Sequence, residues 1–159
     1  MTMQPRERQS LSRRRVLAAG AGIAALAVQL RPALATELPD DLRAAMQAFA
    51  QGAPVREGRV VLEIAELVDN GNAVPVRVAI DAAAGAPVRA MALFNERNPQ
   101  REVIAVEFGP LSGRPEFSTR IRLATTQKIV AVARLQDGSC WSKTVDVIVA
   151  LAACIGEVS

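Results

Sequence analysis

Hydrophobic and polar positions follow two periods along this chain, a helical period near residue 40 and a strand period from residue 60 onward. Between residues 39 and 52, apolar side chains recur three and four positions apart, at Leu42, Ala45, Met46 and Phe49. This spacing predicts a short helix that packs one apolar stripe against the rest of the protein. The helix should end near Gly52-Ala53-Pro54, because glycine and proline both interrupt helical structure.

From residue 60 onward, apolar positions mostly alternate with polar ones, as in strands with one buried face. This alternation predicts strands over residues 60–65, 74–80, 88–94, 103–108, 117–123, 128–135 and 141–151. Turn-forming residues such as Asp69-Asn70-Gly71-Asn72 separate the strands, and Asp137-Gly138 is a tight hairpin signal. Regularly spaced short strands of this kind predict an all-β fold, a two-sheet antiparallel sandwich preceded by one short N-terminal helix.

The first 35 residues differ in composition from the rest. An Arg-rich segment precedes an apolar run from Val16 to Leu30, and Arg31-Pro32-Ala33-Leu34-Ala35 follows as a small-residue cleavage site. The apolar run has about 15 residues, short of the roughly 20 that a membrane-spanning helix needs. This order predicts an export signal, and Ser12-Arg13-Arg14-Arg15-Val16-Leu17 resembles the twin-arginine form. We expect cleavage after Ala35, export to the periplasm and no stable membrane insertion; an uncleaved anchor or amphipathic arm is the alternative.

The leader also accounts for the basic charge of the chain. Of the 19 basic and 16 acidic residues, six basic and one acidic residue lie in positions 1–35, which leaves 13 basic against 15 acidic residues. Electrostatic support for nucleic-acid binding therefore disappears with the leader. We expect three parts: an export signal over residues 1–35, a sandwich domain over 36–151 and a flexible C-terminal tail over 152–159.

Few side chains offer catalytic chemistry. The absence of His excludes a Ser-His-Asp triad and any histidine-bearing metal site. Two Cys cannot form a four-thiolate zinc site, and no phosphate- or dinucleotide-binding motif occurs. Glu63 and Glu66 are interpreted as a solvated pair. The sequence therefore predicts no catalytic residue, no metal site, no cofactor and no enzymatic activity of its own.

Cys154 is the exception, because it stands five residues before the C-terminus, just past the last predicted strand. Ala152 and Ala153 precede it and Gly156 follows, so small residues surround it and predict tail flexibility. A thiol on such a tail could act as a nucleophile inside another protein. The alternative is a buried or disulfide-bonded cysteine.

Cys140 lies at the other end of the last predicted strand. An extended strand advances about 3.3 Å per residue, so the strand would separate Cys140 from Cys154 well beyond the roughly 7 Å Cα limit for a disulfide. We expect no intrachain bridge unless the tail folds back. Cys140 is therefore expected to pack as a small apolar residue.

Several segments, taken in order and spacing, resemble the SoxY family, the Y subunit of the Sox sulfur-oxidation carrier. The segments are Gly58–Val60, Asn70–Val76, Phe94–Pro99, Pro110–Gly113, Ser118–Ala124 and Val130–Ala133. The resemblance implies an immunoglobulin-like sandwich that forms a heterodimer or higher assembly with a SoxZ-like subunit. It also implies that Cys154 attaches sulfur substrates covalently.

In that family, partner enzymes act on the bound substrate. The resemblance implies a haem-containing SoxXA enzyme that attaches thiosulfate, a SoxB hydrolase that removes sulfate, and a molybdenum-containing SoxCD enzyme that oxidises the bound sulfane. The carrier itself does not turn over substrate.

The tail departs from the Gly-Gly-Cys-Gly-Gly ending of the family. Ala152 and Ala153 replace two glycines, and the β-branched Ile155 replaces the glycine after Cys154. We interpret the chain as a variant carrier. The competing hypothesis is a non-catalytic periplasmic interaction module in which Cys154 is structural or forms an intersubunit disulfide.

Overall fold

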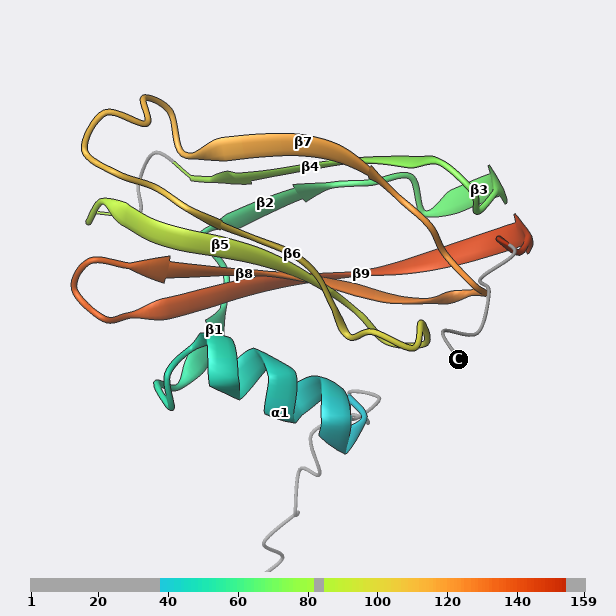
Figure 1. Cartoon of the computed structure of the whole chain (residues 1–159), viewed down its shortest axis with the longest axis horizontal. Coiled ribbons are helices and arrows are strands. Elements are labelled where there is room, and N and C mark those ends of the chain that lie inside the picture. Colours follow the sequence, from blue (N-terminus) through green and yellow to red (C-terminus); the bar gives the residue numbers. More distant parts are fainter. Residues whose placement is uncertain (1–37, 82–84, 154–159) are drawn as a thin grey trace, which may run out of the picture. The chain divides into compact units, whose positions relative to one another are not determined.

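The computed structural model describes residues 38–81 and 85–153, which form one helix and nine strands (Figure 1). The export signal predicted over residues 1–35 lies outside the described residues, as do Cys154 and Gly156. The elements are α1 (Asp40–Phe49), β1 (Val55–Glu57), β2 (Val60–Glu63), β3 (Leu67–Asn70), β4 (Val74–Ile80), β5 (Val88–Asn95), β6 (Glu102–Glu107), β7 (Glu116–Ile121), β8 (Gln127–Leu135) and β9 (Cys140–Leu151).

The strands form two layers (Figure 1). The larger sheet has the order β1-β9-β8-β5-β6, and β3 also pairs with β9. The smaller sheet has the order β2-β4-β7. The all-β, immunoglobulin-like sandwich predicted from the sequence is therefore confirmed, together with its short N-terminal helix.

The core lies between the two sheets and is built from aliphatic side chains. Val78 of the smaller sheet and Leu93, Ile129 and Val147 of the larger one are fully buried. Strands β5 and β8 are buried along almost their whole length, because α1 covers the face that points away from the core. Burial on both faces explains why these two strands read as continuous apolar runs and not as strict alternation.

Helix α1 follows the predicted stripe. Leu42 and Met46 are buried against the outer face of β5 and β8, and Phe49 meets Phe94 edge to face at 6.0 Å between ring centroids. Edge-to-face aromatic packing adds about 0.5–1.5 kcal/mol beyond the burial of apolar area. The helix ends at Phe49, three residues before the Gly52 that the sequence indicates as its limit.

Two short strands are not predicted by the sequence pattern. β1 and β3 have three and four residues, and both pair in parallel with β9. Asp69 and Asn70, expected in a turn, instead lie in β3, and the turn begins at Gly71. β3 forms because a distant strand, β9, offers it a partner, and such pairing leaves no local periodicity. Within the described ranges, no helix is long and apolar enough to span a membrane.

Candidate functional site

The structure describes the chain up to the residue that precedes Cys154. β9 ends at Leu151, Ala152 is exposed, and Ala153 is buried with 7% of its surface exposed. The Ala153 N–H donates a 3.0 Å hydrogen bond to the Leu123 carbonyl. Ala152 and Ala153, which the sequence analysis assigns to the tail, therefore directly follow β9. Ala153, expected to add flexibility, is held by the sandwich because its backbone pairs with the segment after β7.

Three backbone segments meet at this point, and we call the junction of Gly71, Leu123 and Ala153 the tail root. The Gly71 N–H donates to the Leu151 carbonyl at 2.8 Å, and the Leu123 N–H donates to the Gly71 carbonyl at 2.8 Å. With the bond from Ala153 to Leu123, these contacts tie the end of β9 to the turn after β3 and to the segment after β7. The last residue before Cys154 is therefore fixed by two remote parts of the chain.

Gly71 permits this close approach. A Cβ atom at Gly71 would lie 2.4 Å from the Leu123 carbonyl oxygen and 3.1 Å from the Ala153 nitrogen. Both contacts involve backbone, which cannot move away as a flexible side chain would. The sequence identified Gly71 as a turn residue. Its requirement for glycine comes from packing at the tail root, which no turn pattern reveals.

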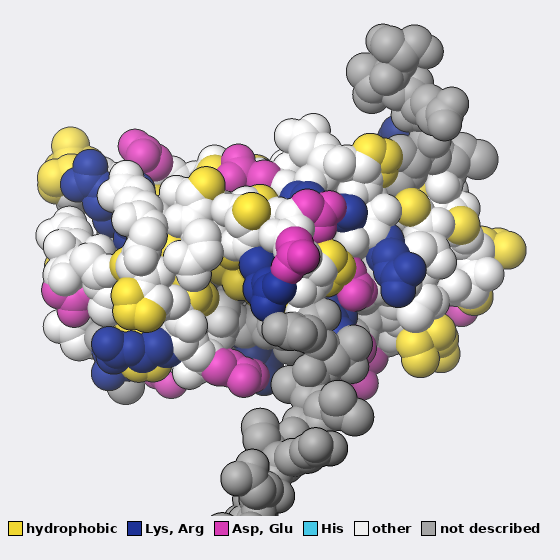
Figure 2. Space-filling model, turned by 90° about the horizontal axis from the view of Figure 1, so that it is seen from below, with side chains coloured by type: hydrophobic (Ala, Val, Ile, Leu, Met, Phe, Trp, Pro, Cys, Tyr) yellow, Lys and Arg dark blue, Asp and Glu magenta, His cyan; other side chains and the backbone are white. Residues whose placement is uncertain are grey.

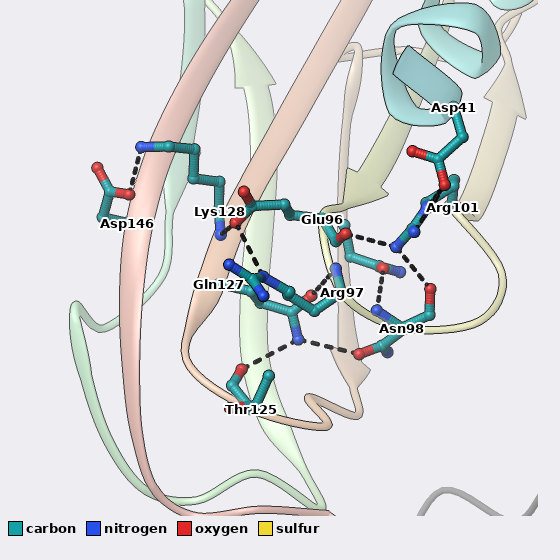
Figure 3. A network of polar contacts seen from close by, with 10 residues as sticks. Asp41, Glu96, Arg97, Asn98, Arg101, Thr125, Gln127, Lys128 and Asp146 are labelled. Atoms are coloured by element: carbon teal, nitrogen blue, oxygen red, sulfur yellow. Dashed lines mark hydrogen bonds and ion pairs between the residues drawn. The ribbon is translucent and has the colours of Figure 1, made fainter. Parts of the chain in front are cut away.

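Asn98 holds the segment that carries Leu123. Its Nδ2 donates to the Arg122 carbonyl at 2.7 Å, and its Oδ1 accepts from the Ala124 N–H at 3.0 Å. The same oxygen accepts from Gln127 Nε2 at 2.9 Å (Figure 3). One amide side chain therefore bonds the backbone on both sides of Leu123. Sequence reasoning placed Asn98 only in a family-like segment and missed this role.

The network continues from Asn98 towards helix α1 (Figure 3). Arg101 donates to the carbonyls of Asn98, at 2.9 Å, and Glu96, and it forms a 2.7 Å ion pair with Asp41. The hydrogen bond from Arg101 lowers the pKa of the Asp41 carboxyl below its usual value. Glu96 is buried and accepts a 3.0 Å hydrogen bond from the Lys128 N–H. The loop between β5 and β6 is thereby joined to both α1 and β8.

Cys140, at the opposite end of β9, is a free thiol with only 1% of its surface exposed. Its nearest polar contact is the Ala50 carbonyl, 3.9 Å from Sγ. Burial raises the pKa of the Cys140 thiol, and the positive charge of Arg134 opposes this only in part. A buried, protonated thiol is a poor nucleophile. The prediction that Cys140 packs as a small apolar residue is confirmed.

The outer face of the smaller sheet carries a shallow hollow of about 540 Å³, bordered by Glu63, Arg77 and Arg120. Arg77 forms ion pairs with Glu63 at 2.7 Å and with Glu116 at 2.6 Å. Both carboxylates, and Glu116 most strongly, raise the pKa of Arg77. Glu63 is thus part of a cross-strand ion-pair ladder. Among residues 38–81 and 85–153, no cluster of three potential metal ligands occurs.

Comparisons with known proteins add a family and a fold. The family model described as "Sulfur oxidation protein SoxY" matches residues 45–154, a region that ends on Cys154. No curated protein matches the sequence. Among solved structures, superoxide reductase (neelaredoxin) from Ignicoccus hospitalis is similar over 58% of this chain and 80% of that chain, with 19% identity and a TM-score of 0.50.

A variant of the same reductase is similar over 71% of this chain and 93% of that chain, with 20% identity and a TM-score of 0.50. At these identities the likeness shows the sandwich fold alone. The family match, in contrast, covers the tail root and reaches the tail cysteine.

Proposed function

This chain belongs to the SoxY family of sulfur oxidation proteins, and from that membership we propose that Cys154 holds sulfur intermediates covalently while other proteins act on them. Membership supports a carrier role in sulfur oxidation, without catalytic activity of its own, and partnership in a SoxYZ complex. The observation that carries the proposal is the matched region, because it runs through the sandwich and ends on Cys154.

The chemistry of the thiol suits the role. In the proposed loading step, the Cys154 thiolate and thiosulfate join through a new sulfur–sulfur bond, and two electrons pass to a haem-containing SoxXA enzyme. In the next step, a SoxB hydrolase catalyses the attack of water on the terminal sulfonate. This hydrolysis releases sulfate and leaves a persulfide on Cys154. A molybdenum-containing SoxCD enzyme would oxidise that sulfane. A thiol is suited to this cycle because its bonds to sulfur are reversible.

The setting of the cycle is also part of the proposal. The twin-arginine-like leader supports a periplasmic location after cleavage. A mobile arm over residues 154–159 would present the thiol, with Gly156 as its most permissive position. Ala153, held by Leu123, would be the fixed point from which this arm extends.

The test is the intact mass of the full chain, paired with its SoxZ-like subunit, after incubation with thiosulfate and SoxXA. We expect a reductant-sensitive addition of one thiosulfate group on Cys154, and no addition in Cys154→Ser. The matched control is Cys140→Ser, which should load as the wild type does because Cys140 is buried. Equal loading of Cys154→Ser and wild type, or no loading of wild type, would refute the carrier. Loss of subunit pairing in Cys154→Ser would instead support a structural cysteine.

A further inference from the structure

Exposed apolar side chains concentrate near the tail root. Of the four large hydrophobic residues that are exposed in the described part of the chain, three lie on β3 and β9. They are Leu67, 66% exposed, Ile148, 56% exposed, and Leu151, 67% exposed. Leu67 and Ile148 are register partners in the parallel β3–β9 pair, so their side chains lie side by side on the same face. Neighbouring exposed apolar side chains of this kind mark interaction sites.

The strand that carries Leu67 is also an open edge. Among the described strands, β3 pairs only with β9, so the far side of β3 presents unpaired backbone groups. Natural proteins usually cover or charge such an edge. Figure 2 shows hydrophobic side chains at the right-hand end, where Figure 1 places β3 and the end of β9.

The charged residues within two positions of Leu67 and Ile148 along the chain are all acidic. Glu66 precedes Leu67, and Asp69 follows it on the same face of β3; both are exposed. Asp146, two residues before Ile148, is exposed and pairs with Lys128 at 2.5 Å. A protein that covers the pair would therefore need an apolar centre with Lys or Arg around it, since charges across an interface are arranged to be complementary.

The position of the tail root indicates which kind of protein binds this surface. Cys154 is bonded directly to Ala153, and consecutive Cα atoms lie about 3.8 Å apart. A protein that reacts with the thiol must therefore bring its reactive group close to the tail root. Ile148 stands five residues before Ala153 along β9, a distance of about 16 Å in an extended chain. A docking face of ordinary size that is centred on Cys154 reaches that far.

We propose that Leu67 and Ile148, with the acidic residues Glu66, Asp69 and Asp146 around them, form the docking surface for the enzyme that loads Cys154. The enzyme face that fits is apolar at its centre and basic at its rim. This inference rests on the proposed function and names the partner surface that it uses. Docking beside the tail root raises the effective concentration of the thiol at the active site of the enzyme.

The test compares Leu67→Glu with Leu111→Glu in the full chain paired with its SoxZ-like subunit. Leu111 is fully exposed in the turn between β6 and β7, so both variants replace an exposed Leu by Glu. We expect Leu67→Glu to lower the rate of thiosulfate loading by SoxXA roughly tenfold or more, as loss of an interface anchor does. Leu111→Glu should stay within about twofold of wild type, as for a residue outside the interface. Alkylation of Cys154 by iodoacetamide should proceed at the wild-type rate in both variants.

The acidic residues of the docking surface are tested by Asp69→Asn. This variant should reduce both the loading rate at low salt and the dependence of that rate on ionic strength. Equal loading of Leu67→Glu and Leu111→Glu would overturn the docking surface while leaving the carrier intact. Loss of the SoxZ-like subunit from Leu67→Glu would also overturn it, because the surface would then be the subunit interface. Failure of the wild type to load would refute the carrier, and this surface with it.

Discussion

The two ends of β9 differ in how the surrounding chain holds them. Cys140 begins the strand between two neighbours, paired with Val55 of β1 on one side and Arg134 of β8 on the other. The end of α1 closes over it at Ala50. The far end of β9 borders the short edge strand β3, and the chain leaves it through Ala153 directly into Cys154.

The comparison teaches that burial differs sharply along one strand, because Cys140 is 1% exposed and Leu151 is 67% exposed. At the start of β9, close packing removes the thiol from solvent and raises its pKa. At the end of β9, backbone hydrogen bonds join Leu151 to Gly71 and Ala153 to Leu123. The first end buries a side chain, and the second holds the backbone of the residue that precedes Cys154.

The largest expected effect is a difference in alkylation between the two cysteines. At pH 8 in the folded protein, we expect iodoacetamide to modify Cys154 about a hundredfold or more faster than Cys140, because only local or global unfolding exposes a buried thiol. Peptide mass spectrometry over time measures both rates. In urea above the unfolding transition the two rates should converge; a fast Cys140 in the folded state would contradict the comparison.

Gly71→Ala should weaken the hydrogen bonds that form the tail root. The added Cβ would meet the Leu123 carbonyl oxygen at 2.4 Å, so backbone must shift, and the free energy of unfolding should fall by about 1–3 kcal/mol. Hydrogen exchange at the Ala153 amide should accelerate in the folded protein. The matched control is Gly109→Ala, whose Cβ would meet only Ser112 Oγ at 3.8 Å. Unchanged protection of Ala153 in Gly71→Ala would show that the junction does not depend on this contact.

Asn98→Ala should weaken the same junction from the other side. The change removes the exposed hydrogen bond to the Arg122 carbonyl and the partly buried one from the Ala124 N–H, and each such bond contributes about 0.5–1.5 kcal/mol. Urea unfolding measures the change in free energy. Asn72→Ala serves as the control, because Asn72 bonds only its neighbour Asn70 on an exposed turn, and its loss should cost less than about 0.5 kcal/mol.

The smallest effect is an acid dependence carried by Asp41. The pKa of Asp41 is lowered in the folded protein, chiefly by the hydrogen bond from Arg101. The contact therefore stabilises the fold above the unfolded pKa near 3.8, and the stabilisation is lost as the pH falls through the lower folded value. In Asp41→Asn, the free energy of unfolding should therefore change less with pH between pH 5 and pH 2, a window of about three units.

The control for Asp41→Asn is Asp40→Asn. Both changes remove one negative charge from the first turn of α1, where it favours the helix. Asp40 forms an ion pair with Arg43 on the same helix, so the difference between the variants compares the Asp41–Arg101 contact with a local ion pair. Equal flattening in the two variants would assign the acid dependence to the helix and not to the network that reaches Asn98.

Elements with a local signal were predictable from the sequence. The stripe of α1 and the Asp137-Gly138 hairpin are both present, and Gly138 takes the positive φ of 82° that the turn requires. β1 and β3 were not predictable, because each is too short to show a period. β1 pairs with a segment about 85 residues away in sequence, at Val55 and Cys140.

The candidate site also has one residue that the sequence indicates and others that it does not. Cys154 could be singled out from the sequence because it is one of two cysteines and lies close to the C-terminus; its role stays a prediction. The amide of Asn98 and the missing Cβ of Gly71 could not be assigned to the site. Their partners lie at Leu123 and its neighbours, which chain distance does not connect to either residue.

The sequence by itself determined the class of the fold, the scarcity of catalytic side chains and the family, because composition and short-range order carry all three. Only the tertiary structure decided that Cys140 is buried and where the chain before Cys154 is held. These depend on backbone contacts among Gly71, Leu123 and Ala153, which come together only when the two sheets pack. A contact between remote segments is a property of the packed sandwich, and no local pattern of residues encodes its distance.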